Sequence, residues 1–110
     1  MLQYTIEKLE ERLKNAEAIP GENKTELLNL VSDLKIEIAD LAKTHNEHAE
    51  SITGFADLST REATRQEKNQ ELIKLSIAGL QSSVRGFETS HPKLVEAVNA
   101  ICTMLSNLGI

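Results

Sequence analysis

The chain has 110 residues, the usual size of a single domain with one hydrophobic core. Apolar residues make up 40% of it, but the only aromatic ones are Tyr4, Phe55 and Phe87, so the core must consist mainly of aliphatic side chains. Two prolines and five glycines are too few for the many turns of an all-β fold. We therefore predict a single all-α domain over residues 1–110.

The net charge of −5 comes from the first fifty residues, which hold eleven Asp and Glu against six Lys and Arg, whereas the remainder holds six of each. An acidic surface repels nucleic acids and anionic membranes, so we expect neither as a partner. The opening MLQYTIEKLEER lacks the basic and apolar regions of a signal peptide, and no run is apolar enough to span a bilayer. Cys102 is the single cysteine, which fits a reducing compartment. We expect a cytoplasmic protein.

Two helices are predicted in the first half from apolar residues that alternate steps of four and three. The first helix covers residues 2–18 and ends before Pro20 and Gly21, which disfavour its continuation. The second helix covers residues 22–43. Its apolar stripe, which we also assign to a subunit interface, consists of Leu27, Val31, Leu34, Ile38 and Leu41. The short turn between the two helices predicts an antiparallel hairpin.

The second half is predicted to contain two further helices. Residues 44–60 are a connector that is either helical or a loop, because the pattern becomes polar between Ser59 and Glu71. The third helix covers residues 60–88, with Ser59 or Thr60 as its cap. The fourth covers residues 92–108. Its predicted turn and cap residues are Ser90, His91, Pro92 and, beyond its C-terminus, Gly109.

Four helices with one long connector predict two antiparallel hairpins that form a bundle or a coiled-coil-like assembly. The outer helices span only about 25 Å, and the second helix with its connector reaches further. That excess would leave apolar residues uncovered in a monomer. We therefore predict a homodimer or other homo-oligomer, whose interface combines the stripe of the second helix with Ile52 and Phe55.

A candidate metal site is formed by His45 and His48, which lie three residues apart in THNEHAE beside Glu47 and Glu50. Structural zinc takes four ligands, and di-metal carboxylate bundles use Glu-x-x-His motifs from two helices, which this chain lacks. A second copy would double the pair. The alternative is that the two histidines tune association with pH.

The remaining candidate residues favour structural roles. His91 would need an adjacent acid or nucleophile for catalysis, and the sequence places none there, so we expect it to shape the turn. Cys102 falls on the buried side of the fourth helix, where a thiol behaves as a small hydrophobe. Arg61, Arg65 and Lys68 form a basic stripe that is either a docking face for an acidic partner or a solvated helix face.

The C-terminal stretch FETSHPKLVEAVNAICTMLSNLGI resembles the end of a bacterial family of small proteins called domain of unknown function 4404. The matching positions are Phe87, Glu88, His91, Pro92, Leu94, Asn107, Leu108, Gly109 and Ile110. Leu108 stands where the family has methionine, and the opening MLQYTIEKLEERL also resembles the first helix of the family. The resemblance implies a short helical protein and supplies no activity.

The chain contains no Gly-rich phosphate loop and no nucleophile elbow, so we predict no cofactor and no enzymatic activity. An enzyme whose site forms between subunits is a weaker alternative. The expected function is that of a helical scaffold or adaptor, which acts through self-association and contacts with a protein partner. The main alternative is a small metal-binding bundle that uses His45 and His48.

Overall fold

The structure, a computed structural model, describes residues 2–17 and 19–109. These residues form five helices and no strand: α1 (Leu2–Asn15), α2 (Gly21–Ala42), α3 (Asn46–Ala63), α4 (Gln70–Ser83) and α5 (Pro92–Gly109). The all-α prediction is confirmed, and the described residues form five helices where about four were predicted. The predicted end of the first helix at Ala18 lies outside the described residues.

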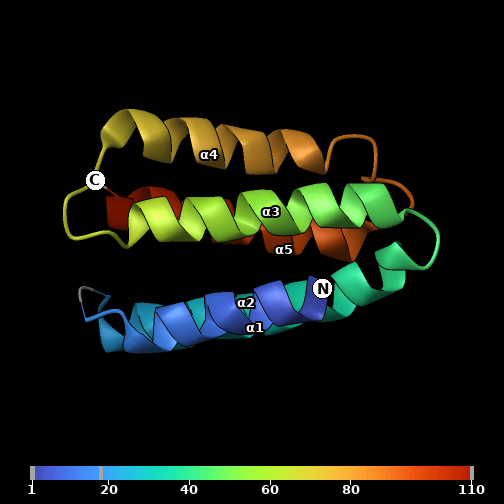
Figure 1. Cartoon of the computed structure of the whole chain (residues 1–110). Helices are drawn as coiled ribbons and strands as arrows, with labels where there is room; N and C mark the ends of the chain where they lie inside the picture. Colours follow the sequence, from blue (N-terminus) through green and yellow to red (C-terminus); the bar gives the residue numbers. More distant parts are fainter. Residues whose placement is uncertain (1, 18, 110) are drawn as a thin grey trace.

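The five helices lie side by side along one axis, and their connections lie at the two ends of the bundle (Figure 1). The longest dimension is 37 Å. Helix α3 contacts each of the other four helices, α1 packs on α2 and α3, and α4 packs on α3 and α5. Helix α3 is therefore the centre of the bundle.

This central helix occupies most of residues 44–60, for which the sequence left helix and loop open. The stretch is helical, and it is a core helix of its own and not a connector. Small and polar side chains make up most of its buried face, which consists of Ala49, Ile52, Thr53, Ala56, Ser59, Thr60, Glu62 and Ala63. Two of the buried hydroxyls bond within the helix: Thr53 Oγ1 donates to the Ala49 carbonyl at 2.8 Å and Ser59 Oγ to the Ala56 carbonyl at 3.2 Å. A pattern of large apolar residues cannot reveal such a face.

The boundaries of the predicted third helix, residues 60–88, are also corrected. Ser59 and Thr60 lie inside α3 and do not cap a new helix. Helix α4 begins at Gln70, where the Asn69 side chain accepts a hydrogen bond from the Leu72 amide at 3.1 Å. It ends at Ser83, and Gly86 then adopts a left-handed conformation with φ of +95°.

One continuous core runs between the helices. Its largest fully buried side chains are Ile6, Leu9, Leu13, Leu27, Leu34, Ile38, Leu41, Ile52, Leu80, Leu94, Ile101 and Leu105. All five helices contribute to this set, α3 with Ile52 and α4 with Leu80. Across the described ranges, no helix is both long and apolar enough to cross a membrane.

Candidate functional site

The residues predicted to form the dimer interface lie almost entirely inside the chain. Leu27, Val31, Leu34, Ile38, Leu41 and Ile52 are each at most 1% exposed. The helices α1, α3 and α5 of the same chain all pack on α2, so they cover the stripe that a second copy was expected to cover. The assignment of these six residues to an interface is therefore wrong, and they belong to the core. Of the seven predicted interface residues, only Phe55, at 37% exposure, lies at the surface.

A different apolar surface is exposed along the contact between α3 and α4. Phe55 and Leu58 on α3 and Leu72 and Leu75 on α4 are 37–58% exposed. We call these four residues the α3–α4 strip. Leu72, Leu75 and Gly79 are spaced by three and four residues, so they share one face of α4. Gly79 on that face lies against Phe55 of α3. Both leucines therefore point to the α3 side. The sequence pattern alone could not show the exposure of the two leucines, because it depends on where α3 lies.

Gly79 allows the strip to form. A Cβ atom built on this residue would overlap Cε1 of the Phe55 ring and lie 2.6 Å from Cδ1. Any larger side chain would therefore displace Phe55. The glycine keeps the Phe55 ring seated on α4 at the price of lower helix propensity.

We expect the effect of Gly79→Ala to depend on Phe55. In a Phe55→Ala background, the substitution should stabilise the fold by about 0.5–1 kcal/mol, because alanine is the better helix former. In the wild-type background, the displaced ring should remove most of that gain. Urea unfolding of the four chains of this double-mutant cycle measures the difference. Equal effects of Gly79→Ala in both backgrounds would contradict the contact.

The three histidines of the chain gather around Phe87 at one end of the bundle. The ring centroids of His45, His48 and His91 lie 5.5, 5.4 and 5.7 Å from that of Phe87, and each ring stands nearly perpendicular to it. They come together because the α2–α3 turn and the α4–α5 loop lie at the same end (Figure 1). His91 Nε2 also lies 3.9 Å from a carboxylate oxygen of Asp40.

This arrangement does not resemble a metal centre. The Phe87 ring is the shared neighbour of the three imidazoles, where a common metal ion would have to lie. Thr44 Oγ1 lies 2.8 Å from His45 Nδ1, and Ser90 Oγ lies 2.9 Å from His91 Nδ1. Among residues 2–17 and 19–109, no three His, Cys, Asp or Glu side chains are placed to hold one ion. The geometry gives the predicted pair His45 and His48 no further ligand.

The predicted basic stripe is engaged within the chain. Arg61 pairs with Asp57 at 2.9 Å and Arg65 with the buried Glu62 at 3.1 Å. The Lys68 ammonium donates to the Leu108 carbonyl at 2.7 Å, a favourable place for a cation at the C-terminus of α5. Only Arg61 lies on a helix, because α3 ends at Ala63. The three residues therefore hold the α3–α4 connection in place.

Comparison with known families gives a match to the domain of unknown function (DUF4404) over residues 56–110, half of the chain. The chain belongs to this family. The DUF4404 match runs from within α3 through α4 and α5. The resemblance predicted at the C-terminus is confirmed, whereas the opening MLQYTIEKLEERL lies outside the matched residues. No curated protein and no solved structure matches the chain.

Several residues that carry the DUF4404 resemblance shape the α4–α5 connection. Phe87 is the centre of the histidine cluster, and Glu88 accepts a hydrogen bond from the Gly86 amide at 2.9 Å. Pro92 is the first residue of α5, a position whose N–H has no acceptor within the helix, so proline loses no hydrogen bond there. The Ser90 hydroxyl bonds to the His91 ring, so the histidine is held toward α2 and Asp40.

Gly109, another DUF4404 position, has a role that sequence analysis did not anticipate. It is the last residue of α5 and not a left-handed residue beyond it. An added Cβ would lie 3.0 Å from Ile73 Cγ2, and the Gly109 carbonyl accepts a bond from Gln70 Nε2 at 2.6 Å. Gly109 therefore lets the end of α5 approach the start of α4. Ile110 lies outside the described residues.

Cys102 is buried in the core at 1% exposure, as the helical pattern predicts. Burial raises the pKa of its thiol from 9.0 to about 11, because the charged thiolate loses its hydration. The thiolate is the reactive form, so this cysteine is chemically quiet at neutral pH. It packs as a small hydrophobic residue.

Proposed function

We propose that this chain is a non-enzymatic, cytoplasmic helical adaptor that self-associates through the α3–α4 strip. The observation that carries the proposal is the exposure of four large apolar side chains along two adjacent helices. Isolated exposed hydrophobic residues are ordinary, but residues grouped in this way are typical of an interaction surface. Two copies related by a two-fold axis would bury the same strip on each.

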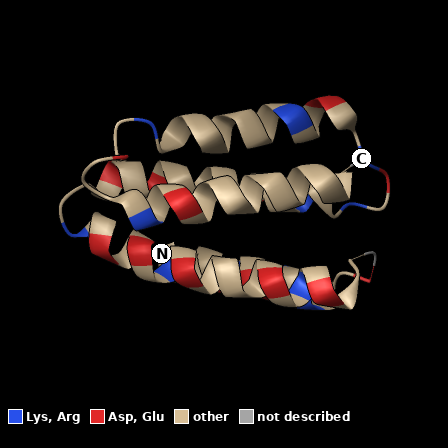
Figure 2. Cartoon of the chain, turned by 180° about the vertical axis from the view of Figure 1, so that it is seen from behind, with Lys and Arg blue, Asp and Glu red and all other residues tan. Residues whose placement is uncertain are grey.

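Charge permits self-association at the α3–α4 strip. Helix α4, at the top of Figure 2, is mostly uncharged, with Glu71 and Lys74 as its charged residues. On α3, Asp57 pairs with Arg61. Two acidic chains repel each other least where their surfaces are neutral. The buried Glu62 beside the strip is neutralised by Arg65. A second copy is therefore the partner that this surface fits best.

The absence of enzymatic activity is part of the same proposal. Its support is that the reactive groups have structural surroundings: the Cys102 thiol is in the core, and His45, His48 and His91 pack around Phe87. The hydroxyls of Thr44 and Ser90 bond to histidine rings of the same cluster. These contacts order one end of the bundle.

Light scattering coupled to size exclusion tests the self-association. At micromolar concentrations, the wild-type mass is expected to exceed the 12.2 kDa of one chain and to approach twice that value as concentration rises. Leu75→Glu places a charge in the strip at a side chain that is 58% exposed, so it should give a folded monomer. Circular dichroism verifies the fold.

Ile36→Glu is the matched control, since Ile36 is 66% exposed and lies on α2, away from the strip. This variant should retain the wild-type mass. A wild-type mass of 12.2 kDa throughout the concentration range would refute self-association. Dissociation by Ile36→Glu, with none by Leu75→Glu, would place the interface elsewhere.

A further inference from the structure

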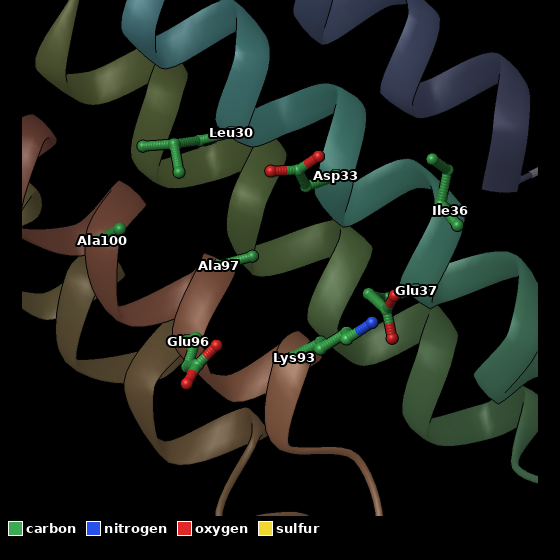
Figure 3. Close-up of a pocket in the computed structure, with 8 residues that line it drawn as sticks. All are labelled: Leu30, Asp33, Ile36, Glu37, Lys93, Glu96, Ala97 and Ala100. Atoms are coloured by element: carbon green, nitrogen blue, oxygen red, sulfur yellow. The ribbon is translucent and has the colours of Figure 1, made fainter.

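A second surface, separate from the α3–α4 strip, is a groove of about 650 Å³ between α2 and α5. Its apolar part consists of Leu30 on α2 and Ala97 and Ala100 on α5 (Figure 3). The groove is open because α5 presents two alanines where larger side chains would fill the space between the helices. Short side chains also allow the backbone of a further helix to approach closely.

The rim of this groove is acidic. Asp33 and Glu37 on α2 and Glu96 on α5 face a single cation, Lys93. Figure 3 shows Lys93 reaching from α5 toward Glu37, with Asp33 and Glu96 on either side of the groove. Within residues 2–17 and 19–109, none of these three carboxylates has an ion-pair partner within 4.0 Å, whereas the carboxylates of Asp57 and Glu62 each pair with an arginine. The groove therefore has an excess of unpaired negative charge.

The most exposed large hydrophobic side chain of the described residues lies at the edge of the same groove. Ile36 is 66% exposed and lines the groove from α2. An occupant that covers Ile36 removes apolar surface from water, which favours binding. The residues from Leu30 to Glu37 extend over about 10 Å, two turns of a helix.

We propose that the α2–α5 groove binds an amphipathic basic helix of a partner protein. Apolar residues of that helix, spaced by three and four positions, would contact Leu30, Ala97 and Ala100. Its Lys and Arg residues would lie against Asp33, Glu37 and Glu96. The inference rests on the proposed adaptor function and deepens it, because it assigns one surface to a second copy and another to a partner of stated chemistry.

A second copy of this chain fits the groove poorly. The basic residues at and after the end of α3 in such a copy, Arg61, Arg65 and Lys68, already bond to Asp57, Glu62 and the Leu108 carbonyl. Helix α2 of a second copy carries five acidic residues against two basic ones and would be repelled, and α1 carries three of each, with no net positive charge. A basic helix from another protein meets neither obstacle.

The test uses a fluorescein-labelled helical peptide of about four turns, built of Leu on one face and Lys on the flanks, with a Leu/Glu peptide for comparison. Fluorescence anisotropy is expected to show saturable binding of the Leu/Lys peptide and none of the Leu/Glu peptide. Glu96→Lys should weaken binding about tenfold by reversing a rim charge. Ala100→Trp should weaken it at least as much by filling the groove.

Glu71→Lys is the matched control, because it makes the same charge change on α4, outside the groove. It should change the affinity by less than about twofold if the rim charges act locally. Equal weakening by Glu71→Lys and Glu96→Lys would overturn the proposal in favour of non-specific attraction. Full binding by Ala100→Trp, or no binding by the wild type, would overturn it as well.

The two proposals fail in distinguishable ways. If the wild-type chain binds the Leu/Lys peptide but remains at 12.2 kDa, the groove stands and self-association fails. If it dimerises without binding the peptide, self-association stands and the groove proposal fails. The Leu75→Glu monomer should bind the peptide like the wild type, since the strip and the groove share no residue.

Discussion

Replacing Ile52 by alanine is expected to lower the free energy of unfolding by about 2–5 kcal/mol. Ile52 is fully buried at the centre of α3, the helix that contacts all four others. Truncation removes apolar contacts and leaves a cavity that the surrounding helices can fill only partly. Urea unfolding, followed by circular dichroism, measures the change.

Leu105→Ala on α5 is the reference for this measurement, because Leu105 is also fully buried and should show a loss in the same range of about 2–5 kcal/mol. Leu58→Ala, at a side chain 38% exposed on the same helix as Ile52, should cost much less. A loss at Ile52 no larger than the loss at Leu58, with a full loss at Leu105, would contradict the central position of α3.

The sequence pattern predicts the class of the fold and most helices correctly, but it misses the reversal between α2 and α3. The chain turns at residues 43–45, where the His45 amide bonds to the Leu41 carbonyl at 2.7 Å. No glycine or proline marks this turn. The four-three spacing also continues through Leu41, His45, His48 and Ile52, so it predicts one long helix or an irregular extension.

That one missed turn explains why the candidate interface was wrong. If α2 and the stretch after it continued in one direction, their apolar residues would need a second copy to cover them, whereas α1, α3 and α5 cover the stripe of α2 in the folded chain. The spacing could show that His45 and His48 lie close together. It could not show that Phe87 and His91 join them, because this depends on which loops share an end of the bundle.

Helix caps are a second kind of sequence signal, independent of the apolar pattern. Asn69 precedes Gln70 and Glu71, and an Asn followed by an acidic residue in the first turn is typical of a helix start. With Asn69 taken as a helix cap, α4 is predicted to begin at Gln70. Residues 46–63 are then predicted to belong to a separate, preceding helix. Helix caps therefore carry more information here than the apolar pattern does.

The stability of the fold is expected to fall between about pH 9 and pH 11 because of Cys102. Burial raises the pKa of this thiol from 9.0 to about 11, so the unfolded chain loses the proton at a lower pH than the folded chain does. The unfolded state then binds fewer protons, and the free energy of unfolding decreases with rising pH. The full shift corresponds to about 2–3 kcal/mol, all of it present below pH 9.

Urea unfolding of the wild type and of Cys102→Ala, at about pH 8 and about pH 11, isolates this effect from the other groups that titrate in the range. The alanine variant loses some packing at both pH values but has no thiol to ionise. Its stability relative to the wild type should therefore rise by about 2–3 kcal/mol between the two conditions. If the difference between the two chains is the same at both pH values, then the thiol is not shielded from water, and α5 does not pack with Cys102 inside the core.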